Sequence, residues 1–195
     1  MTCIIGLLDK EKDCVYIGAD SLASTYTKQF TIKNKKVFKA KDNKNILMAV
    51  CGGVKLINIL SVEEKLIEEI KHLKNEVNLE HIIKYTSPKI ISLAEKYKCC
   101  KYENGISYLD NNLIFTYKNQ LYLIESTGAV IEFEDEYIAD GSGGNFAIAV
   151  LSQNKDKDTI TRIKEGLEAA EKHAVGVKRP YYIMNTMDDE VIVVE

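Results

Sequence analysis

The order in which strand-like and helix-like patterns follow one another is the sequence feature that most constrains the fold of this chain. Short apolar runs with the length and β-branched content of strands occupy 3–8, 15–19, 28–32, 36–39 and 46–51, then 113–117, 120–124, 129–133 and 137–139, then 181–185 and 191–194. Pairs of segments with helical spacing lie between them, beginning near residues 54 and 79 and near residues 144 and 159. Helices gathered in pairs between strands that can pair antiparallel argue against a doubly wound parallel sheet. The sequence therefore predicts an α+β fold, an αββα sandwich of two sheets packed face to face with a helix pair on each outer side.

Two local patterns refine this prediction. Residues 46–51 are almost continuously apolar, which is typical of a strand that is covered on both faces. The helical pattern at 79–98 contains Pro88, and we expect a kink or a break near Ser87 because proline lacks an N–H and clashes with the preceding turn.

Composition indicates the class of protein. The chain has 195 residues, 46% hydrophobic and 28% charged, so we expect a single domain over residues 1–195. The net charge of −3 gives no electrostatic reason to bind nucleic acid or an anionic membrane. The 5 cysteines are odd in number and lack C-x-x-C spacing, which favours a reducing, cytoplasmic environment. No basic segment precedes the first apolar run and no run approaches ~20 apolar residues, so we expect neither a secretory signal nor a membrane span.

Thr2 is the first candidate for a reactive group. Once Met1 is removed, an N-terminal threonine carries nucleophile and base on one residue, because its α-amine has a pKa near ~7.7–8 and can accept the hydroxyl proton. Many chains begin Met-Thr by chance, so Thr2 alone does not indicate catalysis.

A carboxylate and a lysine strengthen this hypothesis. Asp20, within Gly-Ala-Asp-Ser, ends the second apolar run, where it can meet the start of the first strand. Lys35 and Lys36 are successive residues of an extended segment, so one must point inward if both faces of the sheet are covered. A lysine held beside Asp20 would lower the pKa of the Thr2 hydroxyl and orient it, whereas two solvated lysines are the simpler alternative.

Two glycine-rich turns precede predicted helices. Gly52 and Gly53 end a strand, and glycine there lets a backbone N–H approach a reacting carbonyl, as an oxyanion hole requires; a plain tight turn is the alternative. Ser142, within Gly-Ser-Gly-Gly, opens the third helix and would otherwise be an ordinary helix cap. Neither turn has the spacing of a phosphate-binding glycine motif.

Taken in order, these features resemble the proteasome β-subunit family of N-terminal-nucleophile (Ntn) hydrolases. The resemblance covers essentially the whole chain and is greatest to the small proteasome-like proteins of bacteria and their phages, which also start Met-Thr-Cys-Ile. It implies that Thr2 is nucleophile and base and that Asp20 orients a catalytic Lys36. It also implies that Gly52 supplies the oxyanion-hole amide and that Ser142 lies near the threonine amine.

One stretch departs from the family pattern. The family has an Arg-Asp-Ala-x-Ser-like sequence at the end of the fourth helix, where this chain has Lys-His-Ala-Val-Gly. His173 thus replaces the aspartate and Gly176 replaces the serine. Either His173 or Asp140 compensates in proton handling, or activity is reduced or absent. A helix C-terminal residue favoured by the helix dipole is the simpler alternative for His173.

The remaining candidates indicate structural roles. We expect His72 and His81 to be solvated side chains on helices. Cys3 is a rival nucleophile, but it would lack the free α-amine and should point away from Thr2 on the first strand, so we expect it to pack in the core.

The sequence thus favours a threonine-type hydrolase of peptide (amide) bonds that acts on peptides or unfolded proteins and needs no cofactor or metal. The resemblance implies a homo-oligomeric ring around an enclosed chamber, with an ATP-dependent unfoldase as a candidate partner. Two alternatives stay open: a catalytically silent proteasome-like ring or scaffold protein, and an amidase acting on a small non-peptide amide.

Overall fold

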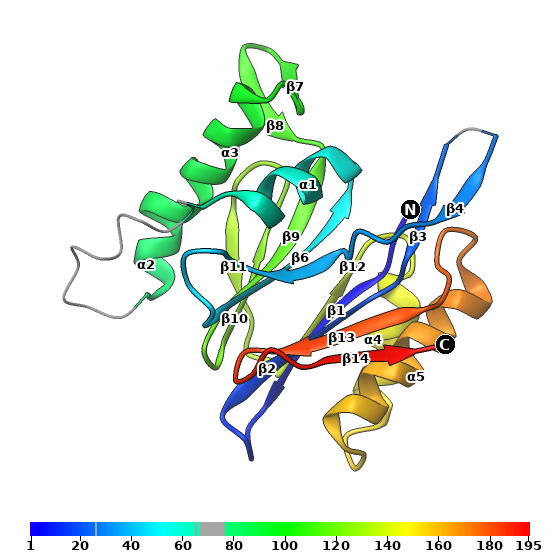
Figure 1. Cartoon of the computed structure of the whole chain (residues 1–195). Helices are drawn as coiled ribbons and strands as arrows, with labels where there is room; N and C mark the ends of the chain where they lie inside the picture. Colours follow the sequence, from blue (N-terminus) through cyan, green and yellow to red (C-terminus); the bar gives the residue numbers. More distant parts are fainter. Residues whose placement is uncertain (26, 65, 67–76) are drawn as a thin grey trace.

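Two five-stranded sheets lie face to face in the computed structural model, which describes residues 1–25, 27–64, 66 and 77–195 (Figure 1). The first sheet has the order β12 (Tyr137–Asp140), β1 (Ile4–Asp9), β2 (Cys14–Ala19), β13 (Tyr181–Asn185) and β14 (Val191–Val194). The second has the order β11 (Val130–Glu132), β10 (Gln120–Ile124), β9 (Asn111–Tyr117), β6 (Ile46–Gly52) and β5 (Val37–Lys39). Neighbouring strands pair antiparallel in both sheets. Two small hairpins project from this body: β3 (Leu22–Ser24) with β4 (Gln29–Thr31), and β7 (Cys100–Glu103) with β8 (Ile106–Leu109).

Helices cover the two outer faces and complete four layers. The first sheet carries α4 (Gly144–Gln153) and α5 (Thr159–His173); the second carries α1 (Val54–Val62), α2 (Leu79–His81), the π-helical turn η2 (Ile82–Thr86) and α3 (Ser87–Lys96). The predicted αββα sandwich is therefore confirmed.

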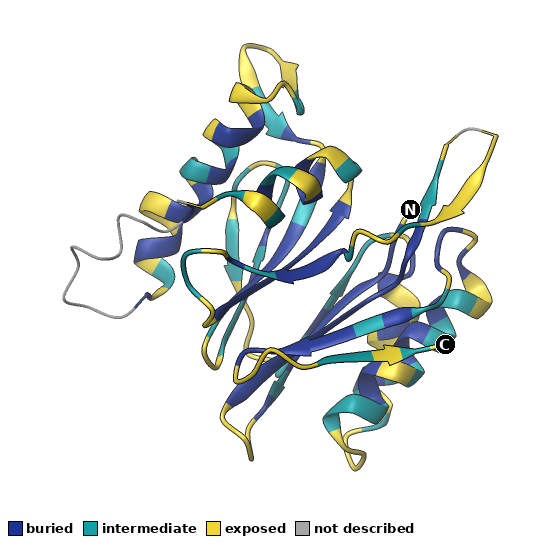
Figure 2. Cartoon of the chain, viewed as in Figure 1, coloured by how far each residue is buried: buried dark blue, intermediate teal, exposed yellow. Residues whose placement is uncertain are grey.

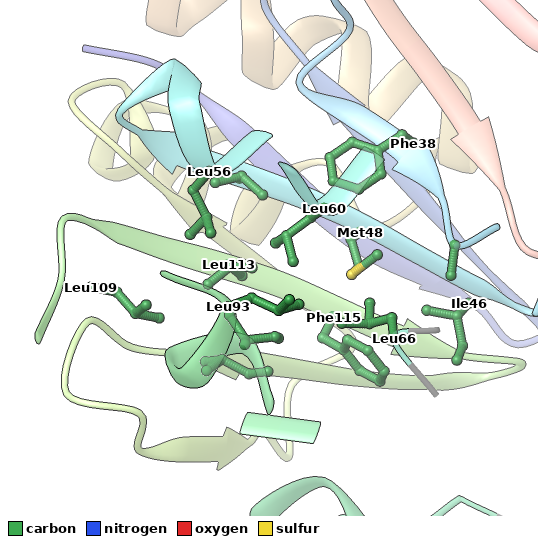
Figure 3. Packing of buried hydrophobic residues seen from close by; sticks show 14 of the residues in the cluster. Phe38, Ile46, Met48, Leu56, Leu60, Leu66, Leu93, Leu109, Leu113 and Phe115 are labelled. Atoms are coloured by element: carbon green, nitrogen blue, oxygen red, sulfur yellow. The ribbon is translucent and has the colours of Figure 1, made fainter. Parts of the chain in front are cut away.

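The side chains of a central strand alternate between two cores, and both faces of that strand are buried (Figure 2). Along β6, Ile46, Met48 and Val50 belong to the cluster beneath α1 and α3 (Figure 3), whereas Leu47 and Ala49 belong to the cluster between the sheets. The prediction that this strand is covered on both faces is confirmed. A slip of one residue would exchange the two sets, so burial worth ~1.5–3 kcal/mol per large side chain fixes the register.

The first helix over the second sheet is shorter than the helical spacing in the sequence predicts. α1 ends at Val62, and Glu63 follows with extended backbone. The helical spacing of apolar residues continues in the sequence through Leu66, Ile67 and Ile70. Leu66 is buried in the core beneath α1 and α3, whereas Ile67, Ile70 and the predicted helical His72 lie outside the described residues.

Pro88 does not break the next helical pattern. The Ser87 N–H donates to the carbonyl of Ile82, five residues earlier, and Pro88 lies in the first turn of α3, where a missing N–H costs little. The irregularity predicted near Ser87 is therefore a π-helical turn that ends directly before it.

The expectation of a solvated His81 is wrong. The residue is only 6% exposed, and its ring lies 5.0 Å from the ring of Tyr85. The reason is that α2 continues directly into η2, which places the neighbouring Ile82 in the core and draws His81 inward with it. Within the described ranges, no helix combines the length and apolar character needed to cross a membrane.

We predict that Gly18→Ala destabilises the protein by ~1–3 kcal/mol, the usual cost of overpacking a core. A Cβ at Gly18 in β2 would lie 2.3 Å from Cγ2 of Ile163, a branched side chain of α5 that has little room to move. Urea unfolding measures the effect. The control is Ile163→Ala, which removes the obstructing atom, so adding Gly18→Ala to that variant should cost less than ~1 kcal/mol. An equal cost in both backgrounds would contradict the steric explanation.

Candidate active site

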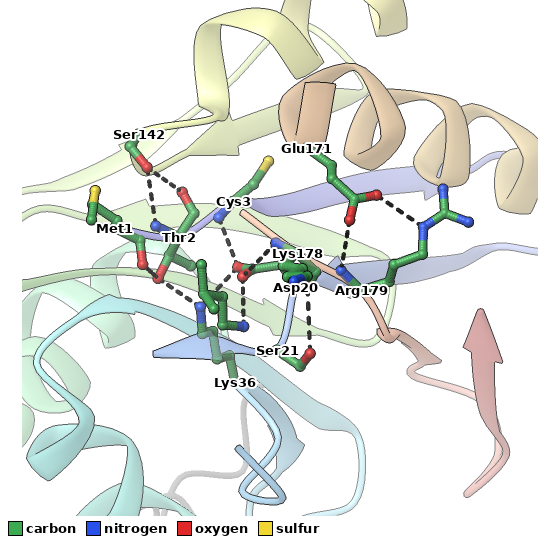
Figure 4. Close-up of polar contacts among 11 residues, drawn as sticks. Met1, Thr2, Cys3, Asp20, Ser21, Lys36, Ser142, Glu171, Lys178 and Arg179 are labelled. Atoms are coloured by element: carbon green, nitrogen blue, oxygen red, sulfur yellow. Dashed lines mark hydrogen bonds and ion pairs between the residues drawn. The ribbon is translucent and has the colours of Figure 1, made fainter. Parts of the chain in front are cut away.

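The loop that precedes α4 holds Thr2 at the start of β1. The Thr2 N–H donates to Oγ of Ser142 at 3.1 Å, and the Thr2 carbonyl accepts from the Gly143 N–H at 3.2 Å (Figure 4). Gly141 has a φ of +91°, and a Cβ there would lie 2.3 Å from the Thr2 carbonyl oxygen. Only glycine therefore allows this loop to approach Thr2 so closely.

Lys36 links Thr2 to Asp20. Its Nζ donates to Thr2 Oγ1 at 2.9 Å and to Asp20 Oδ1 at 2.8 Å, and the residues Thr2, Lys36 and Asp20 are 2%, 2% and 0% exposed. Burial lowers the pKa of Lys36 below its ordinary value, and the nearby Asp20 charge opposes that shift. The neighbouring Lys35 lies instead over the ring of Tyr182, 5.6 Å from its centroid.

Main-chain donors fix the Asp20 carboxylate. Oδ1 accepts from the Cys3 N–H at 3.0 Å, and Oδ2 accepts from the N–H groups of Leu22 at 2.9 Å and Lys178 at 3.4 Å. Together with Lys36 these donors occupy both oxygens, so the carboxylate cannot rotate without losing hydrogen bonds. The arrangement aims Oδ1 at Lys36.

Gly52 ends β6 on the wall of the same site. Its φ is +113°, and a Cβ there would lie 2.3 Å from the carbonyl oxygen of Asp110, so glycine is required. The Asn111 side chain donates to the carbonyls of Cys51 and Gly53, each at 3.1 Å, and so holds the backbone on both sides of Gly52.

A cavity of about 560 Å³ opens onto Thr2 from the solvent side. Its lining includes Gly52, Asn111, Asp140 and Ser142, with Lys101, Glu103 and Tyr108 from the β7–β8 hairpin. Lys36 and Asp20 do not line it. Thr2 therefore lies between the cavity on one side and the buried Lys36 on the other.

The two residues at the departure from the family pattern are not in the hydrogen-bonded group. His173, the last residue of α5, is exposed, and its ring lies 5.4 Å from that of Phe146. It does not line the cavity. Gly176 instead packs against Met1, and a Cβ at position 176 would lie 1.9 Å from the Met1 Cβ. Asp140, the other group considered for compensation, does line the cavity and accepts from the Gly141 N–H at 2.6 Å.

The cysteines nearest to Thr2 have the character of packing residues. Cys3 is fully buried in the core beneath α4 and α5, as expected, and burial raises the pKa of its thiol. Burial, together with the nearby Asp140, raises the pKa of the Cys51 thiol to about 12. Neither thiol is poised to ionise near neutral pH.

Two contributors were missed in the sequence. Asn111 could have been suspected, because a polar Asn-Asn pair directly precedes the apolar run 113–117 and begins β9. Lys178 contacts Asp20 through its main-chain N–H, so the residue type at position 178 could not indicate this contact.

Comparisons with known proteins agree with one another. The family model described as "Proteasome subunit" matches residues 2–176. Proteasome subunit beta 1 of Thermococcus kodakarensis is 29% identical over 161 residues, which are 82% of this chain and 72% of that protein. ATP-dependent protease subunit HslV of Campylobacter concisus is 27% identical over 83% of this chain and 85% of its own. The structure of Thiobacillus denitrificans BPH in complex with epoxomicin is similar over 100% of both chains, with a TM-score of 0.71 and 14% identity.

We predict unequal costs for removing the two members of the buried ion pair. Asp20→Asn leaves the Lys36 ammonium buried without a counter-charge and should destabilise by ~3–5 kcal/mol. Lys36→Met leaves Asp20 with its three main-chain donors and should cost less, ~1–3 kcal/mol. Guanidinium unfolding at one protein concentration measures both. A larger loss for Lys36→Met would contradict this view of the site.

Proposed function

The chain belongs to the proteasome subunit family, and from this premise we propose that it is a threonine-type N-terminal-nucleophile hydrolase that cleaves peptide (amide) bonds. The observation that carries the proposal is the buried Lys36, whose ammonium bonds the Thr2 hydroxyl and Asp20 at once. Such a charge beside a hydroxyl favours its deprotonated form and so activates it as a nucleophile.

Each group has a defined role in the proposed reaction. After Met1 is removed, the Thr2 α-amine takes the proton of Oγ1 as Oγ1 attacks the substrate carbonyl, while the Gly52 N–H binds the developing oxyanion. The amine then gives the proton to the leaving nitrogen, which leaves an ester on Thr2. A water molecule, deprotonated by the same amine, attacks the ester carbonyl, and the amine returns that proton to Oγ1 as the C–O bond breaks and the acid product leaves. Ser142, whose Oγ lies 3.1 Å from the Thr2 nitrogen, orients that amine.

The names of the relatives extend the proposal to partners. Because similar proteins are named proteasome subunit and ATP-dependent protease subunit, we propose a homo-oligomeric ring that receives peptides or unfolded proteins, with an ATP-dependent unfoldase as its partner. We also propose a cytoplasmic location, which the cysteine content favours.

A second candidate is a proteasome-like ring or scaffold protein without activity. Positions 173 and 176 favour this candidate. The resemblance implies an aspartate and a serine there, whereas this chain has an exposed His173 and a Gly176. An amidase of a small non-peptide amide would keep the same Thr2 chemistry and differ only in its substrate.

We predict that a peptide epoxyketone or a β-lactone labels Thr2 only after Met1 has been removed. With Met1 attached, the Thr2 nitrogen is an amide without basicity near pH 7, and the Thr2 hydroxyl donates to the Met1 carbonyl at 2.5 Å. Intact-mass spectrometry compares protein with an exposed Thr2 and protein that retains Met1, with Thr2→Ala as the blank. Equal labelling of both forms would exclude the Thr2 mechanism, and no labelling of the folded, Met1-free form would favour the scaffold.

We predict a loss of at least ~10²-fold in amide hydrolysis for Lys36→Ala, the usual effect of removing a proton-transfer or electrostatic group. Lys35→Ala is the matched control, because its side chain lies over Tyr182 and away from Thr2. Steady-state peptide cleavage measures both variants, and circular dichroism checks that they fold. Equal losses from the two substitutions would show that the role of Lys36 is not catalytic.

We predict that the protein forms an oligomer of several subunits at micromolar concentration, because a ring requires self-association through closed symmetry. Multi-angle light scattering measures the mass directly. A monomer of 22.0 kDa at every accessible concentration would remove the ring and leave a single-domain hydrolase.

A further inference from the structure

A clamp of three hydrogen bonds lies at the end of α5, behind the candidate active site. The Glu171 carboxylate accepts from the Arg179 main-chain N–H at 3.2 Å, from Arg179 Nε at 2.9 Å and from the Tyr181 hydroxyl at 2.5 Å. Burial raises the pKa of Glu171, but the hydrogen bonds from Tyr181 and Arg179 outweigh it and hold that pKa below its ordinary value. Glu171 is therefore a charged acceptor at neutral pH, and charge-assisted hydrogen bonds of this kind are strong.

The residue before Arg179 touches the active-site carboxylate. The Lys178 N–H donates to Asp20 Oδ2 at 3.4 Å, and the Lys178 carbonyl accepts from the Ser21 N–H at 3.1 Å and from Ser21 Oγ at 3.3 Å. These contacts use the main chain of Lys178, so they depend on where the chain runs and not on its side chain. Figure 4 shows the two hydrogen bonds from Arg179 to Glu171 together with the contacts of Lys178.

Lys178 is the point at which the segment between α5 and β13 reaches the site. Among the described residues, neither His173 nor Gly176 has a hydrogen bond to Thr2 or Asp20. Arg179 is the next residue, and Glu171 bonds both its main chain and its side chain, so Glu171 helps to fix the position of this segment beside Asp20.

We propose that Glu171 is a positioning residue for the reaction proposed above: by clamping Arg179 it fixes Lys178 against Asp20, and through Asp20 it sets the distance of Lys36 from the Thr2 hydroxyl. The inference rests on the proposed function of Thr2. Loss of the clamp would let the main chain at Lys178 withdraw from Asp20. Lys36 would then be displaced from the Thr2 hydroxyl, and reaction rates are sensitive to such misplacement.

Glu171→Gln tests the proposal, because it keeps the size of the side chain but offers one acceptor oxygen where the carboxylate offers two. We expect kcat for peptide cleavage by the assembled, Met1-free protein to fall about tenfold, while KM stays within about twofold. KM should change little because Glu171 does not line the cavity beside Thr2.

Two control variants separate positioning from general stability. Glu168→Gln removes the charge of another partner of the Arg179 guanidinium, which lies 3.3 Å from Nη2 and has no contact with the Arg179 main chain. Tyr181→Phe removes a hydrogen bond from Glu171 and should lower Tm, but it leaves Arg179 clamped. Both should keep kcat within about twofold of the unsubstituted protein. An unchanged kcat in Glu171→Gln, or a fall in all three variants that follows their loss of Tm, would overturn the proposal.

A readout that needs no activity keeps the two proposals distinguishable. Amide hydrogen exchange at Ser21 and Leu22 reports the contacts with Lys178 and Asp20. Faster exchange there in Glu171→Gln, but not in Glu168→Gln, supports the clamp even if the unsubstituted protein cleaves nothing, in which case the proposed function alone fails. Equal exchange in the two variants overturns the clamp.

Discussion

Burial of the Lys36 ammonium is the interaction on which the arrangement of the site depends. An ammonium taken from water costs several kcal/mol unless an opposite charge and hydrogen-bond acceptors replace its hydration. Here the acceptors, Asp20 and the Thr2 hydroxyl, adjoin strands of the first sheet, whereas Lys36 directly precedes an edge strand of the second. The ion pair is therefore formed only when the two sheets stack with these strand ends together. Folding of the sandwich and assembly of the site are thus the same event.

The Asp20 carboxylate has a fixed orientation, and it therefore orients the Lys36 ammonium. The carboxylate accepts main-chain N–H groups from the residue before β1, from the first residue of β3 and from the segment before β13. Donors of this kind are held by the backbone, so they orient the carboxylate before any substrate arrives, and such preorganisation is what makes electrostatic stabilisation effective. The lysine is consequently aimed at Thr2 by the fold itself and not by the flexible choice of one rotamer.

The sequence predicted the position of a side chain or a layer correctly where the pattern of residue types allowed few other arrangements. Two successive lysines on an extended segment between covered faces required one to point inward, and Lys36 does so. The four layers followed from the grouping of helices in pairs. Contacts made by the main chain, such as that of Lys178, left no trace in the residue types. The prediction of a solvated His81 was wrong. Charged residues near it in the sequence suggested a solvated helix face, whereas the packing of η2 decides which side chains are buried there.

Met1 connects the departure from the family pattern with the surroundings of Thr2. Met1 lines the cavity in front of Thr2, and its carbonyl accepts the hydrogen bond of the Thr2 hydroxyl. Its side chain occupies the space beside Gly176, where a Cβ would lie 1.9 Å from the Met1 Cβ. A serine at position 176 and Met1 in this position therefore exclude each other. Removal of Met1 would therefore do two things at once: it would remove the carbonyl that accepts from the Thr2 hydroxyl, and it would empty the space beside Gly176.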